Sequence, residues 1–391
     1  LYMKDDDKKA YDLKLQDVVF IHLAQDFETN NKEFRINSEI PIPVQLQDGT
    51  DEIKGEEGIS IAMLASGLIK VIAHKPEHDH ISYYIDFLLA LQPDVVHELQ
   101  LAGASKAKTG DLDFAIELYL AAVHINPAIP ELYVNIATLY ARHAKQAVDD
   151  ENNELFDSYT RKQIAILKEG LKAHPLSHLL LSEFGLLQLF LGNDEIALEY
   201  LKKYLSYAPD GEKRQIIEEK VKELQQQSQD EQTLQEAFDE MQLGNEQQAL
   251  NLISEFCTRN EKNWSGWFIK GWALRRLERY EEAQQCFLTC LTLGERNPDI
   301  YNELSICALE LKERELAKDY LEIALEMEED NLTILSNLAF LLLEDEQYNK
   351  VSHLLIKAKK IDENDPMIKN LIEQLFIRSG IELHEEEVVH D

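Results

Sequence analysis

The chain has 391 residues, of which 73 are Asp or Glu and 39 are Lys or Arg, so its formal net charge is −34. This charge repels phosphate backbones and anionic lipid surfaces, which argues against nucleic acid as a partner. No apolar run reaches the roughly 20 residues that a membrane span needs, so we expect no membrane insertion. The four cysteines form no CxxC pair and are interpreted as buried thiols of a reducing compartment. We therefore expect a cytoplasmic protein; a periplasmic or exported one would follow if an N-terminal signal had been removed.

The first segment, residues 1–56, lacks the pattern of the remaining chain and is expected to form a small irregular or β-containing head. Between Ile40 and Leu46, apolar residues alternate with two prolines and a glutamine, which predicts a short edge strand. The apolar stretch from Val18 to Leu23 fits either a strand or a helix turn. Residues 49–58 are expected to be a solvated loop. We expect this head to pack over the first helices.

Helical spacing of apolar residues begins at Ile59 and runs to Ala73, and a second helix is expected from about His80 to Leu91. Together they predict a degenerate first hairpin. His74, His78 and His80 lie between or at the ends of these helices, and imidazoles at such spacing can share a divalent ion. No fourth ligand is fixed nearby, so we favour histidines in an exposed turn and expect no metal and no cofactor.

The sequence predicts a helical hairpin most clearly between Gly103 and Pro127. Gly110 supplies the turn, Pro127 ends the second helix, and small residues at Gly103 and Ala115 let the two helices approach closely. The same pattern recurs along the chain, and Trp267, Tyr301 and Leu335 mark successive steps of 34 residues.

A 34-residue period with small and aromatic anchors resembles the tetratricopeptide repeat family, over roughly residues 96–363. The resemblance implies an all-α, right-handed α-solenoid superhelix of helix-turn-helix repeats, here about seven hairpins. It also implies that the first helix of each hairpin lines a concave groove that binds extended peptide segments.

The third hairpin, from Pro130 to Pro175, carries 14 residues more than the period allows. Its acidic tip is Asp149 to Glu154, and apolar residues on both sides of the tip predict that each helix extends about two turns past its neighbours. The tip is either a docking feature or an enlarged solvated loop, and we favour the loop.

Two arrays are expected, residues 57–228 and 229–380. The first ends in an amphipathic helix, after which Ser228 and Glu231 form a capping box that predicts the start of a new helix. The second array closes with a helix from Met367 to Arg378, followed by an acidic tail at residues 381–391. We expect the end of this tail, HEEEVVHD at residues 384–391, to be disordered.

No sequence motif for catalysis is present: there is no HExxH, no Walker A loop and no GxGxxG. Carboxylates are abundant and spread over solvent faces, so pairs of them arise by chance. We therefore do not expect an enzyme.

One helix is unusual because all three tryptophans of the chain fall within WSGWFIKGW, followed by ALRRLER. Trp267 matches a packing position of the family and is expected in the core. Phe268, Trp272 and the arginines that follow are not needed there, and aromatic and arginine side chains often dominate binding energy. They suggest a partner segment with a carboxylate and an apolar side chain. Alternatively, the aromatics pack on the next repeat and the arginines pair with acids of the chain.

By the resemblance, the residues that face the concave groove and bind a peptide are Phe268, Trp272, Arg275, Arg276, Asn302, Ile306, Asn337 and Phe340, with Asn135, Thr138 and Arg142 in the first array. These features predict a non-catalytic scaffold or adaptor that binds a protein or peptide partner, as a monomer. The alternative is a structural subunit of a homo-oligomer or larger assembly that uses the same surfaces.

Overall fold

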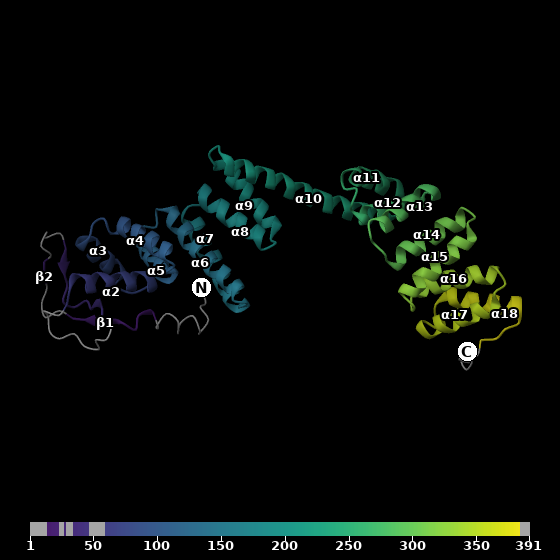
Figure 1. Cartoon of the computed structure of the whole chain (residues 1–391), viewed down its shortest axis with the longest axis horizontal. Coiled ribbons are helices and arrows are strands. Elements are labelled where there is room, and N and C mark those ends of the chain that lie inside the picture. Colours follow the sequence, from purple (N-terminus) through teal and green to yellow (C-terminus); the bar gives the residue numbers. More distant parts are fainter. Residues whose placement is uncertain (1–13, 23–26, 29–33, 47–58, 384–391) are drawn as a thin grey trace. The chain divides into compact units, whose positions relative to one another are not determined.

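The computed structural model describes residues 14–22, 27–28, 34–46 and 59–383. A small β-containing head comes first in the chain and is followed by helices packed in hairpins (Figure 1). The predicted all-α repeat fold is therefore confirmed. The chain forms two compact units, residues 1–224 and 225–391, and each has a core of its own. The expected loop at residues 49–58 and the last residues of the acidic tail, 384–391, lie outside the described residues.

The head contains two small antiparallel sheets. Strand β1 (Val18–Ile21) pairs with β4 (Ile42–Gln45), and β2 (Phe27–Glu28) pairs with β3 (Arg35–Ile36). The edge strand predicted between Ile40 and Leu46 is thus confirmed, and the apolar stretch at Val18 is a strand. Buried Ile42 and Val44 anchor β4 against helix α2 (Ile61–His74). The head therefore packs over the first helices, as expected.

The helices of the first unit form pairs, and glycines lie where the two helices of a pair approach each other closely. A Cβ at Gly103 would lie 3.0 Å from the ring of Tyr119, so the absence of a side chain sets how closely these two helices pack. Gly110 has φ 87°, which confirms it as the turn residue. The first hairpin is irregular because α2 packs on α5 and β4 as well as on α3. The other helices here are α3 (Ile81–Leu91), α4 (Val95–Thr109), α5 (Leu112–Ile125), α6 (Pro130–Asp149), α7 (Asn153–Ala173), α8 (His178–Phe190) and α9 (Asp194–Tyr207).

The extended third hairpin is confirmed. Helices α6 and α7 have 20 and 21 residues, against 14 in α5 and 13 in α8. The difference of about seven residues corresponds to about two turns per helix.

The sequence predicted that a new helix starts at Ser228. This prediction is wrong, because helix α10 runs without interruption from Glu212 to Leu243. The segment between the two cores contains no Gly or Pro and is rich in Gln and Glu, which favour a helix. Side-chain amides also bond carboxylates one turn ahead, which stabilises a solvated helix. These pairs are Gln226 with Asp230, Gln227 with Glu231, Gln232 with Glu236 and Gln235 with Asp239.

The second unit continues the hairpins with regular spacing. Its first hairpin combines the end of α10 with α11 and turns at Gly244, where φ is 80°. The predicted closing helix is confirmed as α18, which buries Ile368, Leu371 and Leu375. The helices are α11 (Glu246–Arg259), α12 (Trp264–Arg276), α13 (Tyr280–Thr292), α14 (Pro298–Glu310), α15 (Arg314–Met327), α16 (Leu332–Glu344), α17 (Tyr348–Ile361) and α18 (Pro366–Ser379).

All four cysteines, Cys257, Cys286, Cys290 and Cys307, are buried in this unit as free thiols. Burial raises the pKa of Cys286 to about 11 and that of Cys290 to about 12. Neutral, buried thiols of this kind are core filler, as the sequence indicated.

Candidate protein-binding surface

Helix α12 is oriented by two glycines that pack against the neighbouring helices. A Cβ at Gly271 would lie 2.9 Å from the ring of Phe287, and one at Gly266 would lie 2.6 Å from Phe256. Asn263 starts the helix by accepting a hydrogen bond from the backbone N–H of Gly266 at 3.1 Å. Trp267 is half-buried against the core, and its indole N–H donates to the carbonyl of Glu261 at 2.8 Å.

The two aromatic residues predicted to bind a partner are half-buried. The ring of Phe268 lies 5.6 Å from that of Phe287 in an edge-on arrangement, so it packs within its own hairpin. The ring of Trp272 lies 6.0 Å from that of Phe238 on α10. Trp272 is therefore paired with an aromatic residue of the preceding hairpin and retains an accessible face.

The arginines of α12 are engaged with carboxylates of this chain. Arg275 forms a two-point ion pair with Glu303 on α14, and Arg276 binds Glu246 on α11 at 2.7 Å. Burial raises the pKa of Glu303, even though Arg275 acts in the opposite direction. The positive charge on this side of α12 is thus neutralised within the chain.

The two asparagines of α14 and α16 are bonded to each other. The amide of Asn337 donates to the side-chain oxygen of Asn302 at 2.8 Å. In this structure Asn337 links two repeats, whereas the resemblance led us to expect it to bind a peptide in the groove. Together with Arg275 and Glu303, this pair joins α12, α14 and α16 side by side.

The residues predicted in the first unit lie together on α6. Asn135 is half-buried, and Thr138 is exposed and donates to the carbonyl of Val134 at 2.9 Å. Arg142 donates to the carbonyl of Ala107 at 2.9 Å, which satisfies an acceptor in the last turn of α4. Two of the three side chains are thus engaged in bonds to helix backbone.

Four apolar side chains recur at one position of four successive hairpins, and we call them the apolar ladder: Phe238, Trp272, Ile306 and Phe340, each 34 residues after the last. Phe238 is 39% exposed and Phe340 is 38% exposed, while the other two are half-buried. They lie on α10, α12, α14 and α16, the first helices of their hairpins (Figure 1). Our sequence reasoning missed Phe238, although counting one period back from Trp272 would have found it.

The three histidines considered for a metal site have other partners. The expectation of an exposed turn is wrong for His74, which is buried in the last turn of α2. His74 Nε2 lies 2.8 Å from Glu117 Oε2, and His78 Nδ1 accepts from the backbone N–H of His80 at 3.1 Å. The His78 ring also stacks on Phe20 at 5.9 Å. In the described part of the chain, no group of three or more His, Cys, Asp or Glu side chains is placed to hold a metal ion.

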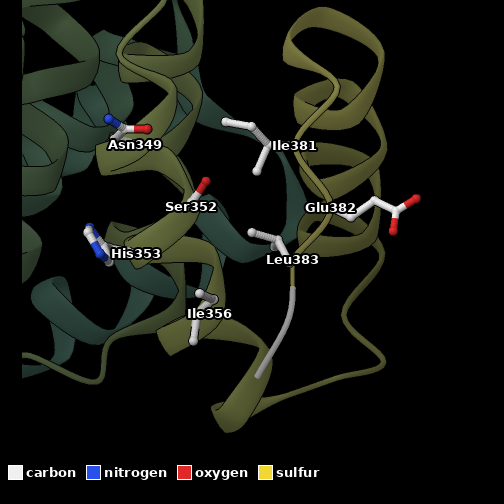
Figure 2. A pocket seen from close by; sticks show the side chains of 7 residues that line it. All are labelled: Asn349, Ser352, His353, Ile356, Ile381, Glu382 and Leu383. Atoms are coloured by element: carbon white, nitrogen blue, oxygen red, sulfur yellow. The ribbon is translucent and has the colours of Figure 1, made fainter. Parts of the chain in front are cut away.

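A groove of about 410 Å³ lies elsewhere in the second unit, between α17 and the segment that follows α18. Figure 2 shows that α17 lines one side and residues 381–383 the other. Its apolar side chains are Ile356, Ile381 and Leu383, and the Ser352 hydroxyl donates to the carbonyl of Tyr348 at 3.0 Å. The groove lies on a second helix of a hairpin and is separate from the apolar ladder.

Comparison with known proteins identifies the repeat. A tetratricopeptide repeat family profile matches residues 265–295, which span most of α12 and all of α13. These residues therefore form a tetratricopeptide repeat, and hairpins are stacked at the same period on either side of it.

Individual relatives are distant. A 110-residue stretch is 31% identical to the 131 kDa subunit of transcription factor tau from Saccharomyces cerevisiae, and it covers 27% of this chain and 11% of that protein. A tetratricopeptide repeat protein of Parabacteroides merdae is 17% identical with a TM-score of 0.33, covering 72% of this chain and 99% of that structure. The yeast Sti1 domain solved with an Hsp90 peptide is 15% identical with a TM-score of 0.32, covering 68% and 99%.

No helix in the described part of the chain combines the length and the apolar character that crossing a membrane would require.

Proposed function

We propose that the second unit binds a segment of a partner protein along the apolar ladder, and that the chain acts as a non-catalytic scaffold or adaptor in the cytoplasm. The partner is a protein or peptide, not nucleic acid, and no cofactor takes part. The observation that carries this proposal is the ladder itself. Four apolar side chains at one repeat position keep accessible surface, although burying them inside their own hairpins would stabilise the fold.

The chemistry of the ladder supports binding of an extended segment. Two Phe and one Trp offer large apolar area with few rotatable bonds, which is typical of residues that dominate protein interfaces. Three of the four ladder helices, α12, α14 and α16, are joined by the ion pair of Arg275 with Glu303 and by the bond between Asn302 and Asn337. The surface is thus held in place before a partner arrives, which reduces the entropy lost on binding.

A second candidate role is that of a structural subunit in a homo-oligomer. Helix α18 favours it, because Phe376 is 49% exposed and Ile377 is 70% exposed on the last helix of the stack. Light scattering over a dilution series distinguishes the two roles. A mass that falls on dilution supports the oligomer, and a constant monomer mass supports the adaptor.

The adaptor role is tested by affinity capture with the full chain, followed by calorimetry with the purified partner. We expect Trp272→Ala to weaken binding by about 2 kcal/mol while leaving the helix content unchanged. Ile323→Ala is the matched control, since Ile323 is 39% exposed on α15, the second helix of its hairpin. Equal affinity of the wild type and the Trp272 variant for every captured partner would exclude the ladder as the binding surface.

A further inference from the structure

We propose that the segment bound by the apolar ladder is basic as well as apolar, with Lys or Arg side chains beside the apolar ones. This inference rests on the proposed function and specifies the chemistry of its partner. The basic segment proposed here differs from the acidic segment that the arginines of α12 suggest from the sequence alone.

The positive charge on this surface is already neutralised within the chain. Two arginines of α12 each bind one carboxylate of the chain, Arg275 with Glu303 and Arg276 with Glu246. On α16, Glu344 lies one turn after Phe340 and binds Arg378 of α18. An acidic partner would have to displace these carboxylates, one of which is largely buried, since the Glu303 side chain is 13% exposed. Displacing a buried carboxylate leaves it without its partner, which is costly.

The charge that remains on this surface is negative. Three exposed carboxylates lie on the same helix faces as the ladder: Glu231 precedes Phe238 by two turns, Asp299 precedes Ile306 by two turns, and Glu310 follows Ile306 by one turn. Because each of these arginines is paired with one carboxylate, the three further carboxylates give the surface a net negative charge.

A segment that carries Lys or Arg beside apolar residues fits both the apolar side chains and the carboxylates of this surface. The stems of Lys and Arg are apolar and pack on aromatic rings, while their charged ends reach carboxylates at the edge. Glu310 and Ile306 are separated by a single turn, so one basic side chain reaches across both. The net charge of −34 adds a long-range attraction for such a segment.

The experiment is a selection of random short peptides, displayed on phage, against the full chain. Peptides that also bind the double variant Trp272→Ala/Phe340→Ala are removed, so that those retained require the ladder. Retained peptides are synthesised with a fluorescent label, and their affinities are measured by anisotropy. We expect them to combine apolar residues with Lys or Arg, and to lose about thirtyfold in affinity in the Trp272→Ala variant.

Two charge-reversal variants then separate the local effect from the overall charge. Glu231→Lys/Glu310→Lys changes the ladder surface, while Glu322→Lys/Glu326→Lys makes the same change in net charge on exposed positions of α15. We expect the first to weaken binding by about tenfold and the second to have little effect. If the first variant fails to fold, the wild type still tests the inference, because added salt should lower its affinity for a basic segment.

Four outcomes would overturn the inference. Ladder-dependent peptides that are acidic or uncharged, or an affinity insensitive to salt, would contradict the basic partner while leaving the proposed function in place. Equal losses in the two charge-reversal variants would assign the attraction to the whole chain and not to the ladder. A selection that yields no peptide requiring Trp272 would count against the proposed function as well.

Discussion

The guanidinium of Arg275 and the carboxylate of Glu303 form a two-point ion pair between α12 and α14, and the Glu303 side chain is only 13% exposed. This pair removes a cation from the candidate binding surface and joins two neighbouring repeats. It therefore affects both binding and stability.

Replacing Glu303 with Gln separates these effects. We expect Glu303→Gln to lower the free energy of unfolding by about 1 to 3 kcal/mol, because it leaves Arg275 partly buried without its counter-charge. The freed guanidinium should also raise affinity for acidic peptides, measured by anisotropy. The double variant Arg275→Met/Glu303→Met is the control, and it should be more stable than Glu303→Gln. If Glu303→Gln proves as stable as the wild type, the pair does not join the repeats.

Three turns of the second unit place residues other than glycine in the left-handed region. Glu278, Lys312 and Glu346 have φ of 61°, 65° and 60°. Each Cβ is strained there, so we expect Gly at any of the three to raise the free energy of unfolding by about 0.5 to 1 kcal/mol. Urea unfolding measures this. Glu281→Gly, in the first turn of α13, should lower stability instead. A lower urea midpoint for Glu278→Gly as well would show that the turn is not strained.

The head depends on the absence of a side chain at Gly67. A Cβ there would lie 2.4 Å from the carbonyl oxygen of Pro43, so β4 would have to move. We expect Gly67→Ala to expose the amides of β1 and β4 to hydrogen exchange while the hairpins from α4 onward stay protected. Ser66→Ala, one residue earlier on α2, is the control. Unchanged exchange in Gly67→Ala would mean that the head does not rest on this contact.

The exposed middle of α10 is the place where a helix break should be tolerated. Residues 225–229 are all exposed, and the nearest core residues are Leu224 and Ala237. We expect Ser228→Pro, which costs about 3 kcal/mol in a helix interior, to accelerate cleavage by a Glu-specific protease at Glu231. The cores of the two units should remain protected, and Ser228→Ala should cleave no faster than the wild type. A general loss of helix signal in Ser228→Pro would show that the two cores unfold together.

Acidification should destabilise the first unit through His124. Burial lowers the pKa of His124 from 6.5, and its Nδ1 lies 2.7 Å from the carbonyl of Ile72. The unfolded chain therefore takes up a proton before the folded one does. Stability is lost as pH falls below 6.5, and the loss is complete below the folded pKa. Thermal unfolding between about pH 7.5 and pH 5 measures this. His124→Asn should weaken the pH dependence of the unfolding temperature, and His353→Asn, at an exposed position, should not. The same pH dependence in both variants would exclude this role for His124.

The sequence predicted the repeat well, because the signals are local. Gly103, Gly110 and Ala115 show which faces meet and where the chain turns, and the same spacing fixes the next hairpin. The extended helices of the third hairpin followed from a simple count of residues. The capping box at Ser228 misled us because a short motif also occurs inside helices. Four side-chain pairs along α10 favoured continuing the helix over starting a new one.

The candidate surface was only partly predictable. The period alone assigns Trp272, Ile306 and Phe340 to one position, and it could have assigned Phe238 as well. It could not show that Arg275 binds Glu303 or that Asn302 binds Asn337. A periodic pattern reports which side of its own helix a residue occupies, and so the sequence determined the hairpins and their faces. Ion pairs and hydrogen bonds between repeats depend on the distance between side chains about 30 residues apart in the chain, and only the packed helices determine that distance.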